Sequence, residues 1–147
     1  MSPLTPEQAA LVSAARAVRE RAYAPYSRFR VGAALLTTSG EIFSGCNVEN
    51  ASYGGTICAE RNAILGMVAH ALRPHDAGVA FRPRIAQIAV FTDAAELAMP
   101  CGLCRQVIAE FEAGAHVIVA NPRAERVIAF AELFPEPFVL RSEGGEG

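Results

Sequence analysis

Two short cysteine motifs, Cys58-Ala59-Glu60 and Pro100-Cys101-Gly102-Leu103-Cys104, constrain the fold of this chain more than any other feature. Residues three apart on a helix share a face, so Cys101 and Cys104 can reach one metal ion. That pair alone is also typical of a redox dithiol or of two buried core cysteines. The first motif places a further cysteine at the start of another helix. Three thiolates leave one coordination position open, as in catalytic zinc sites, so the fold should bring two helix N-termini together.

Glu60 is expected beside this site without being a ligand. Residues i and i+2 of a regular helix point to opposite sides, so Cys58 and Glu60 share a pocket only if Cys58 lies at the edge of its helix. A carboxylate next to an open coordination position is suited to proton transfer. The order Cys58-x-Glu60, then Pro100-Cys101-x-x-Cys104, resembles the motif pair of zinc-dependent deaminases. A solvated carboxylate in a first helical turn is the alternative for Glu60.

The pattern of apolar residues predicts one α/β domain. Thr5-Pro6-Glu7-Gln8 forms a capping box that begins a helix of about 16 residues. Further helices are expected at 59–71 and 101–111. Short apolar runs predict strands at 31–38, 42–48, 85–92, 117–120 and 127–130.

The order of these elements predicts the architecture. The first two strands read as an antiparallel hairpin, whereas strand, helix and strand between 85 and 120 require a parallel pair with a right-handed crossover. We therefore expect a three-layer α-β-α domain with a mixed, about five-stranded sheet. The domain should span residues 1–141, and the polar, glycine-rich residues 142–147 should form a flexible tail.

Composition narrows the class of function. The 147 residues are 52% hydrophobic and 19% charged, which allows a core without disulfides. The net charge is −2 and the arginines are scattered, which argues against a nucleic-acid partner and favours a small, uncharged ligand. No signal peptide or membrane span is expected, so we predict a cytoplasmic protein, in which four cysteines suggest metal binding or catalysis before disulfides.

A broader similarity covers roughly Glu7 to Phe138, where the chain resembles the small, homotetrameric, zinc-dependent cytidine deaminases. The similarity is carried by four segments in fitting order: Ala24-Pro25-Tyr26-Ser27-Arg28-Phe29 with Val31-Gly32-Ala33-Ala34-Leu35, Gly45-Cys46-Asn47-Val48-Glu49-Asn50-Ala51, Cys58-Ala59-Glu60-Arg61, and Pro100-Cys101-Gly102-Leu103-Cys104-Arg105-Gln106. It implies deamination of free cytidine and deoxycytidine to uridine and deoxyuridine by zinc-activated water, with release of ammonia, in pyrimidine salvage. It also implies a homotetramer with active sites at subunit contacts.

The resemblance assigns the reacting groups and the ribose contacts. Zn²⁺ would be bound by three thiolates, those of Cys58, Cys101 and Cys104. Glu60 would move protons between the attacking water, N3 of the pyrimidine and the leaving amino group. The ribose 3′-hydroxyl would be bound by Asn47 and Glu49, which as residues i and i+2 of a strand share one face.

The resemblance also assigns residues around the base. Phe29 would line the pocket, and the backbone N–H of Ala59 would meet the base carbonyl. Tyr53 of a neighbouring subunit would approach the 5′ side, and Phe138 would cross a subunit contact to the pyrimidine ring. Ordinary core packing is the alternative for both phenylalanines, and a turn position is the alternative for Tyr53.

Arg61 would hydrogen-bond the ligand sulfurs. Three thiolates on Zn²⁺ leave a formal charge of about −1, which opposes the ionisation of a bound water. A nearby guanidinium would offset that charge. A surface arginine is the alternative reading of Arg61.

Other readings stay open on the sequence alone. A nucleic-acid-editing deaminase, a deaminase of a cytosine-containing antibiotic, a metal-free redox dithiol and a non-catalytic zinc-stabilised binding module are the competing functions. Cys46 is expected to be a small buried hydrophobe, and none of the three histidines (His70, His75 and His116) is expected to bind metal. No role is assigned to the 73–84 connection, and no residue ranks cytidine against deoxycytidine.

Overall fold

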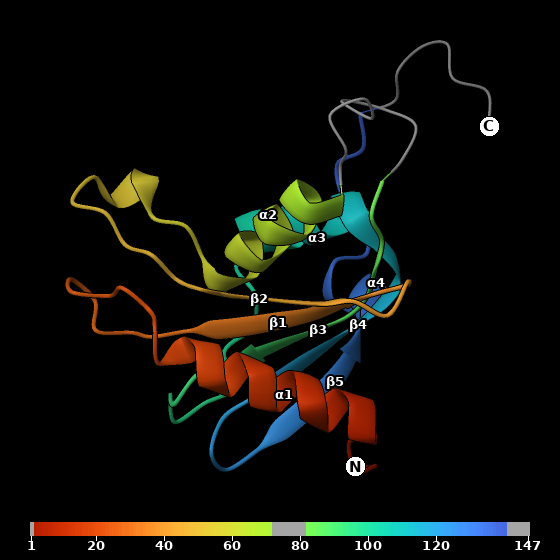
Figure 1. Ribbon diagram of the computed structural model, residues 1–147, viewed down its shortest axis with the longest axis horizontal. Coiled ribbons are helices and arrows are strands. Elements are labelled where there is room, and N and C mark those ends of the chain that lie inside the picture. The colour runs from red at the N-terminus through yellow and green to blue at the C-terminus, as the bar shows by residue number, and fades with distance from the viewer. Residues whose placement is uncertain (1, 72–81, 141–147) are drawn as a thin grey trace.

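The computed structural model describes residues 2–71 and 82–140, which form three layers. A five-stranded sheet lies in the middle, with α1 on one face and α2 and α3 on the other (Figure 1). The helices are α1 (Pro6–Arg19), α2 (Ala59–Ala71), α3 (Gly102–Phe111) and α4 (Phe130–Leu133), with a 3₁₀ turn at Tyr53–Gly55. The strands are β1 (Gly32–Thr37), β2 (Ile42–Cys46), β3 (Ile85–Phe91), β4 (Glu112–Ala120) and β5 (Glu125–Ala129).

The strand order β2-β1-β3-β4-β5 confirms the predicted mixed sheet. β1 and β2 form the expected antiparallel hairpin, and α3 connects β3 to the parallel β4. β1 pairs antiparallel with β3, and β5 pairs antiparallel with β4. The carboxyl end of β3 therefore leads directly to the segment that carries Cys101 and Cys104.

Each face of the sheet has its own apolar core. Leu11 and Ala15 of α1 are fully buried against one face, where Ile118 of β4 is also buried. Met67 of α2 and Ile108 of α3 are buried against the other face. The predicted capping box starts α1, because Thr5 Oγ1 accepts from the Gln8 N–H and Gln8 Oε1 accepts from the Thr5 N–H.

A glycine lets α2 lie directly on the backbone of β2. A Cβ atom at Gly45 would lie 2.4 Å from the backbone nitrogen of Ala63 and 2.8 Å from the carbonyl oxygen of Ala59. Real Cβ atoms do not approach backbone this closely, so only glycine permits the contact. The contact includes Ala59, the first residue of α2. It therefore fixes the distance between the N-terminus of this helix and the sheet.

Several predicted boundaries were wrong. β2 ends at Cys46 because Val48 leaves the sheet to form single bridges with Tyr23 and Ile57. β4 begins at Glu112 rather than 117, since Gly114 adopts a φ of 65° and the pairing with β3 shifts register between Ile85 and Gln87.

The remaining differences lie near the ends of elements. α1 ends at Arg19 and has 14 residues, two fewer than the expected length of about 16. Phe130 is the first residue of α4, whereas it was expected to end a strand. The tail 142–147 and most of the 73–84 connection lie outside the described residues. Among the helices of 2–71 and 82–140, none is long and apolar enough to span a membrane.

Candidate metal centre and active site

Three of the four cysteines meet where the N-termini of α2 and α3 come together. Cys58 directly precedes α2, Cys101 is the N-cap residue of α3, and Cys104 lies in its first turn. The three Sγ atoms all lie within 4.8 Å of one another, and those of Cys58 and Cys101 are 3.9 Å apart. The structure thus brings together the three cysteines that the two motifs singled out.

The cluster fits a zinc ion. Tetrahedral zinc with Zn–S bonds of about 2.3 Å holds its sulfurs about 3.8 Å apart, close to the Cys58–Cys101 separation. Cys104 is buried, Cys58 is half-buried and Cys101 is exposed, so the cluster opens to solvent on one side. Three sulfurs with one open side suit a catalytic ion rather than a structural one, which takes four protein ligands.

The electrostatics of the cluster favour thiolate at Cys58. Hydrogen bonding from the Cys104 thiol, assisted by Arg61 and Cys101, lowers the pKa of Cys58 to about 5 against the opposing effect of burial. The same hydrogen bond raises the pKa of Cys104. Both helix dipoles also place their positive ends at the cluster. A divalent cation is the partner that would hold all three sulfurs deprotonated together.

Glu60 lies in the first turn of α2 and is only 5% exposed. Burial is the main cause that raises the pKa of its carboxyl, and the negative charge on Cys58 adds to the effect. A carboxyl group with a raised pKa exchanges protons more readily near neutral pH. The solvated-carboxylate alternative does not agree with this burial.

Arg61 follows Glu60 and faces the sulfurs. Its Nη2 donates to Cys58 Sγ at 3.5 Å and to the carbonyl oxygen of Thr56 at 3.3 Å. The hydrogen bond to Cys58 is the main cause that raises the pKa of Arg61. Its Nε is buried and has no partner within residues 2–71 and 82–140. The guanidinium therefore places positive charge against the thiolates, as the donor set of an anionic zinc centre requires.

Comparisons with known proteins agree with this geometry. Residues 5–120 match the family described as the cytidine and deoxycytidylate deaminase zinc-binding region. The chain belongs to this deaminase family. Zn²⁺ is the cofactor of the family's zinc-binding region, and the cluster of Cys58, Cys101 and Cys104 could hold it.

Individual members of the family are similar along most of the chain. A cytidine deaminase of Halalkalibacterium halodurans is 42% identical over 130 residues, covering 87% of this chain and 91% of the relative. One of Sporosarcina psychrophila is 46% identical over 101 residues, covering 69% of this chain and 67% of the relative. A crystal structure of cytidine deaminase from Burkholderia pseudomallei superposes with a TM-score of 0.77 at 44% identity, covering 92% of this chain and all of the other.

Asn47 of this family member is buried just beyond β2 and uses both ends of its amide. Its Nδ2 donates to the carbonyl oxygen of Phe29 at 2.7 Å, and its Oδ1 accepts from the Val31 N–H at 2.8 Å. An amide has two N–H groups and two lone pairs, so one of each remains for another partner. Asn47 thus fixes the segment that carries Phe29.

Glu49, like Asn47, binds the loop of residues 24–31. Its carboxylate accepts hydrogen bonds from the Tyr26 and Ser27 N–H groups and from the Ser27 hydroxyl. These donors, the Ser27 hydroxyl first, lower the pKa of Glu49. The carboxylate borders a cavity of about 280 Å³ that is also lined by Tyr26, Ser27, Tyr53 and Thr56.

The three aromatic residues singled out from the sequence are all exposed. Phe29 is 42% exposed, and Tyr53 and Phe138 are 75% and 70% exposed. Core packing within this chain, the alternative for the phenylalanines, does not agree with these values. The Tyr53 ring packs edge-on against Tyr26 with centroids 5.8 Å apart, and Gln106 Nε2 donates to the carbonyl oxygen of Phe138 at 2.9 Å.

Ala59 and the remaining candidates occupy distinct positions. Ala59 is the first residue of α2, where the backbone N–H has no acceptor within the helix. Cys46 ends β2 and is half-buried rather than fully buried. His70 pairs with Glu41 at 3.2 Å, and His116 is exposed on β4. Neither histidine belongs to the sulfur cluster, and His75 lies outside the described residues.

Two features of the site escaped the sequence analysis. The hydroxyl and the N–H of Ser27 both bind Glu49. Arg105 donates to the carbonyl oxygens of Pro100 and Leu133, both at 2.8 Å, and so holds the segment in front of Cys101 against α4. The positions of Ser27 and Arg105 depend on tertiary packing, and no local pattern marks them.

Proposed function

We propose that the protein hydrolyses cytidine and deoxycytidine to uridine and deoxyuridine, releasing ammonia, in pyrimidine salvage. The observation that carries this proposal is a three-sulfur cluster, open on one side, beside the buried carboxyl of Glu60. Membership of the cytidine and deoxycytidylate deaminase family supports the reaction class. In the reaction, water adds to C4 of the pyrimidine and the bond from C4 to the amino nitrogen breaks.

The described site has a residue for each step, from activation of the water to protonation of the leaving amino group. Cys58, Cys101 and Cys104 would hold Zn²⁺, which supplies Lewis-acid activation of water when bound. Glu60 takes a proton from the attacking water, gives a proton to N3 of the pyrimidine and later passes one to the leaving amino group. The raised pKa of its buried carboxyl suits repeated transfers in both directions. Arg61 donates to the Cys58 sulfur and offsets the negative charge of the thiolates.

The nucleoside is bound on the side of the 24–31 loop. Asn47 and Glu49 bind the ribose 3′-hydroxyl; Asn47 retains a free N–H and lone pair, and Glu49 borders a cavity. Phe29 lines the base pocket, and the N–H of Ala59 binds the base carbonyl. These ribose contacts favour a free nucleoside over a polynucleotide. The scattered arginines agree with this, because a protein that binds a phosphate backbone usually carries a basic stripe.

Residues from a second copy complete the site in a homotetramer. Tyr53 approaches the 5′ side of a substrate bound to a neighbouring subunit, and Phe138 reaches its pyrimidine ring. The exposure of both rings supports this assembly, because large aromatic side chains left in solvent mark contact surfaces. Light scattering should give a mass four times the 15.6 kDa of the chain.

The protein acts in the cytoplasm as one domain spanning residues 1–141. None of its four cysteines forms a disulfide in the described residues, which is consistent with a reducing compartment. Fractionation of cells followed by immunodetection tests the location, and limited proteolysis tests the domain.

The decisive experiment follows the loss of absorbance when cytidine or deoxycytidine is added to the zinc-loaded protein. Cytosine, CMP and a cytosine-containing oligonucleotide serve as controls. We expect turnover of the two nucleosides and little of the controls. Turnover of the oligonucleotide without turnover of cytidine would overturn the proposal. Zinc quantification distinguishes the proposed zinc enzyme from a metal-free redox dithiol.

A further inference from the structure

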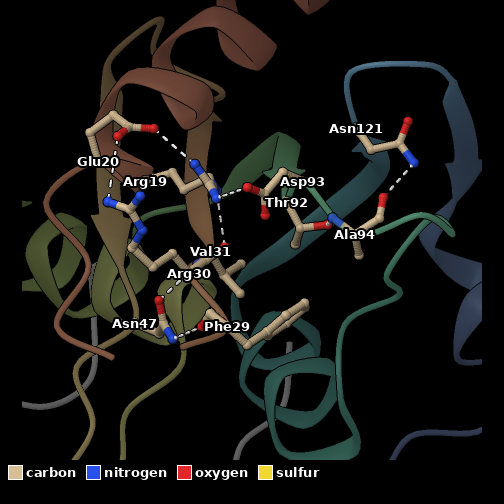
Figure 2. A network of polar contacts seen from close by, with 10 residues as sticks. All are labelled: Arg19, Glu20, Phe29, Arg30, Val31, Asn47, Thr92, Asp93, Ala94 and Asn121. Atoms are coloured by element: carbon tan, nitrogen blue, oxygen red, sulfur yellow. Dashed lines mark hydrogen bonds and ion pairs between the residues drawn. The ribbon is translucent and has the colours of Figure 1, made fainter. Parts of the chain in front are cut away.

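A buried arginine, Arg19, connects three separate parts of the chain (Figure 2). It is the last residue of α1, and only 9% of its side chain is exposed. Its guanidinium donates to the carbonyl oxygen of Arg30 at 3.2 Å, to the Glu20 carboxylate at 2.8 Å and to the Asp93 carboxylate. A buried charge with three acceptors has little freedom to move, so Arg19 is a fixed point between these segments.

The carbonyl that Arg19 binds lies in the segment that carries Phe29. On either side of the Arg30 carbonyl, Asn47 binds the Phe29 carbonyl and the Val31 N–H. Each of the three consecutive residues 29–31 therefore has one backbone group fixed by a side chain. Arg28, just before them, has a φ of 58°, a left-handed conformation that a side chain disfavours. The segment therefore depends on these tertiary hydrogen bonds to keep its shape.

The other partner of Arg19 lies in the connection that leads to the metal centre. Asp93 follows β3 in the stretch that ends at Pro100 and Cys101. Asn121 holds the same stretch from the far side, because its Nδ2 donates to the carbonyl oxygen of Ala94 at 3.1 Å (Figure 2). It also donates to the carbonyl oxygen of Ala95 at 3.3 Å. The Arg19–Asp93 ion pair thus couples the Phe29 segment to the stretch that positions Cys101.

We propose that Arg19 and Asp93 are positioning residues for substrate binding, acting as a clamp that holds Phe29 at the pyrimidine pocket. The inference rests on the proposed role of Phe29 in cytidine binding. When the clamp is broken, the Phe29 segment samples other conformations and the substrate must order it. Part of the binding free energy is then spent on ordering, so KM rises while proton transfer at Glu60 keeps its rate.

The test uses the zinc-loaded full-length protein and four variants. Asp93→Asn removes the ion pair at an exposed position, and Arg19→Met removes all three contacts. Asp93→Glu keeps the carboxylate, and Glu96→Gln makes the same charge change in an exposed part of the same connection. The measurements are KM and kcat for cytidine, zinc content, and hydrogen–deuterium exchange of the peptide that spans residues 24–32.

Asp93→Asn and Arg19→Met should raise KM by about 10-fold, with kcat and zinc content close to those of the wild type. The 24–32 peptide should exchange faster in both, and Asp93→Glu and Glu96→Gln should match the wild type. Unchanged KM and exchange in Asp93→Asn would overturn the clamp, as would a loss confined to kcat. If Arg19→Met does not fold, Asp93→Asn decides alone. Absence of cytidine turnover in the wild type would refute the proposed function instead, and the exchange data would still test the clamp.

Discussion

The guanidinium of Arg61 lies 3.5 Å from the sulfur of Cys58, placing a permanent positive charge against a cluster of three thiols. Its Nε is buried without a partner in the described residues, and its Nη2 donates to the Cys58 sulfur and to the Thr56 carbonyl oxygen. Neutralising this charge should leave excess negative charge on the zinc-bearing cluster. Arg61→Gln should therefore lower kcat/KM by about 10- to 100-fold, the usual effect of changing a residue that supports metal ligands.

Steady-state kinetics and zinc quantification check this prediction. Arg61→Lys is the matched variant, because it keeps the charge but loses the planar donors of the guanidinium. It should retain more activity than Arg61→Gln. Equal activity of Arg61→Gln and the wild type would show that the charge has no role at the site.

Glu60→Gln should abolish turnover while keeping fold and metal. The substitution conserves volume in a buried position but removes the group that moves protons. We expect kcat to fall by at least about 10²-fold, since general acid–base catalysis contributes about 10²- to 10⁴-fold. Circular dichroism and zinc content should match the wild type. Near-normal rates in this variant would remove Glu60 from the mechanism.

Removal of one sulfur should release or weaken zinc. Cys101→Ala leaves two thiolates, too few for the three-ligand arrangement of a catalytic zinc. Cys46→Ala is the control, because Cys46 lies outside the sulfur cluster. Metal analysis after gel filtration should show substoichiometric zinc in Cys101→Ala and full zinc in Cys46→Ala. Full occupancy in Cys101→Ala would contradict the proposed ligand set.

The sequence was most informative where spacing alone determines position. Two cysteine motifs predicted two helix N-termini at one site, and the three sulfurs lie within 4.8 Å of one another. The capping box at Thr5 and the parallel pair of β3 and β4 were also confirmed. The catalytic, metal-binding and substrate-binding roles of the individual residues stay predictions.

Features set by tertiary contacts could not be predicted. β4 begins five residues early because it continues through Gly114, whose φ is 65°, and pairs with β3 across a register shift between Ile85 and Gln87; this pairing is a tertiary contact. No sequence pattern links Arg19 to Asp93, and only the fold brings the two side chains into an ion pair. Asn47 was assigned to the ribose alone because no pattern indicated that its amide also binds Phe29 and Val31.

Gly45→Ala should destabilise the protein and reduce its activity together. The added methyl group would meet backbone atoms of Ala63 and Ala59 at 2.4 and 2.8 Å, which cannot rotate away. Overpacking of this kind costs about 1–3 kcal/mol, and the displaced helix carries Glu60. Gly66→Ala is the control on the same helix, where an added Cβ meets no atom outside the local helix backbone within 4 Å in residues 2–71 and 82–140.

Denaturant unfolding distinguishes the two glycine variants. Gly66→Ala should be about 0.5–1 kcal/mol more stable than the wild type, because alanine favours the helix. Gly45→Ala should unfold at lower denaturant and show a higher KM or lower kcat. Wild-type stability in Gly45→Ala would mean that α2 does not rest on the β2 backbone as described.

Glu49 should make stability depend on pH in the acid range. The Ser27 hydroxyl and the Tyr26 and Ser27 N–H groups bind its ionised form only in the folded state, so folding lowers its pKa from the usual 4.5. The folded state then binds fewer protons than the unfolded state in this range. The resulting stabilisation is complete above the unfolded pKa and is lost as pH falls through the lower, folded pKa.

Unfolding free energies of the wild type, Glu49→Gln and Ser27→Ala between pH 7 and pH 3 measure this contribution. Both variants should lose stability at pH 7 and show a shallower decline on acidification, since each removes part of the preference for ionised Glu49. Glu125→Gln, at an exposed position on β5, should decline as the wild type does. A wild-type acid slope in Glu49→Gln would show that the hydrogen bonds from the 24–31 loop do not stabilise the carboxylate. The loop that carries Phe29 would then still be held by the hydrogen bonds of Asn47 and Arg19.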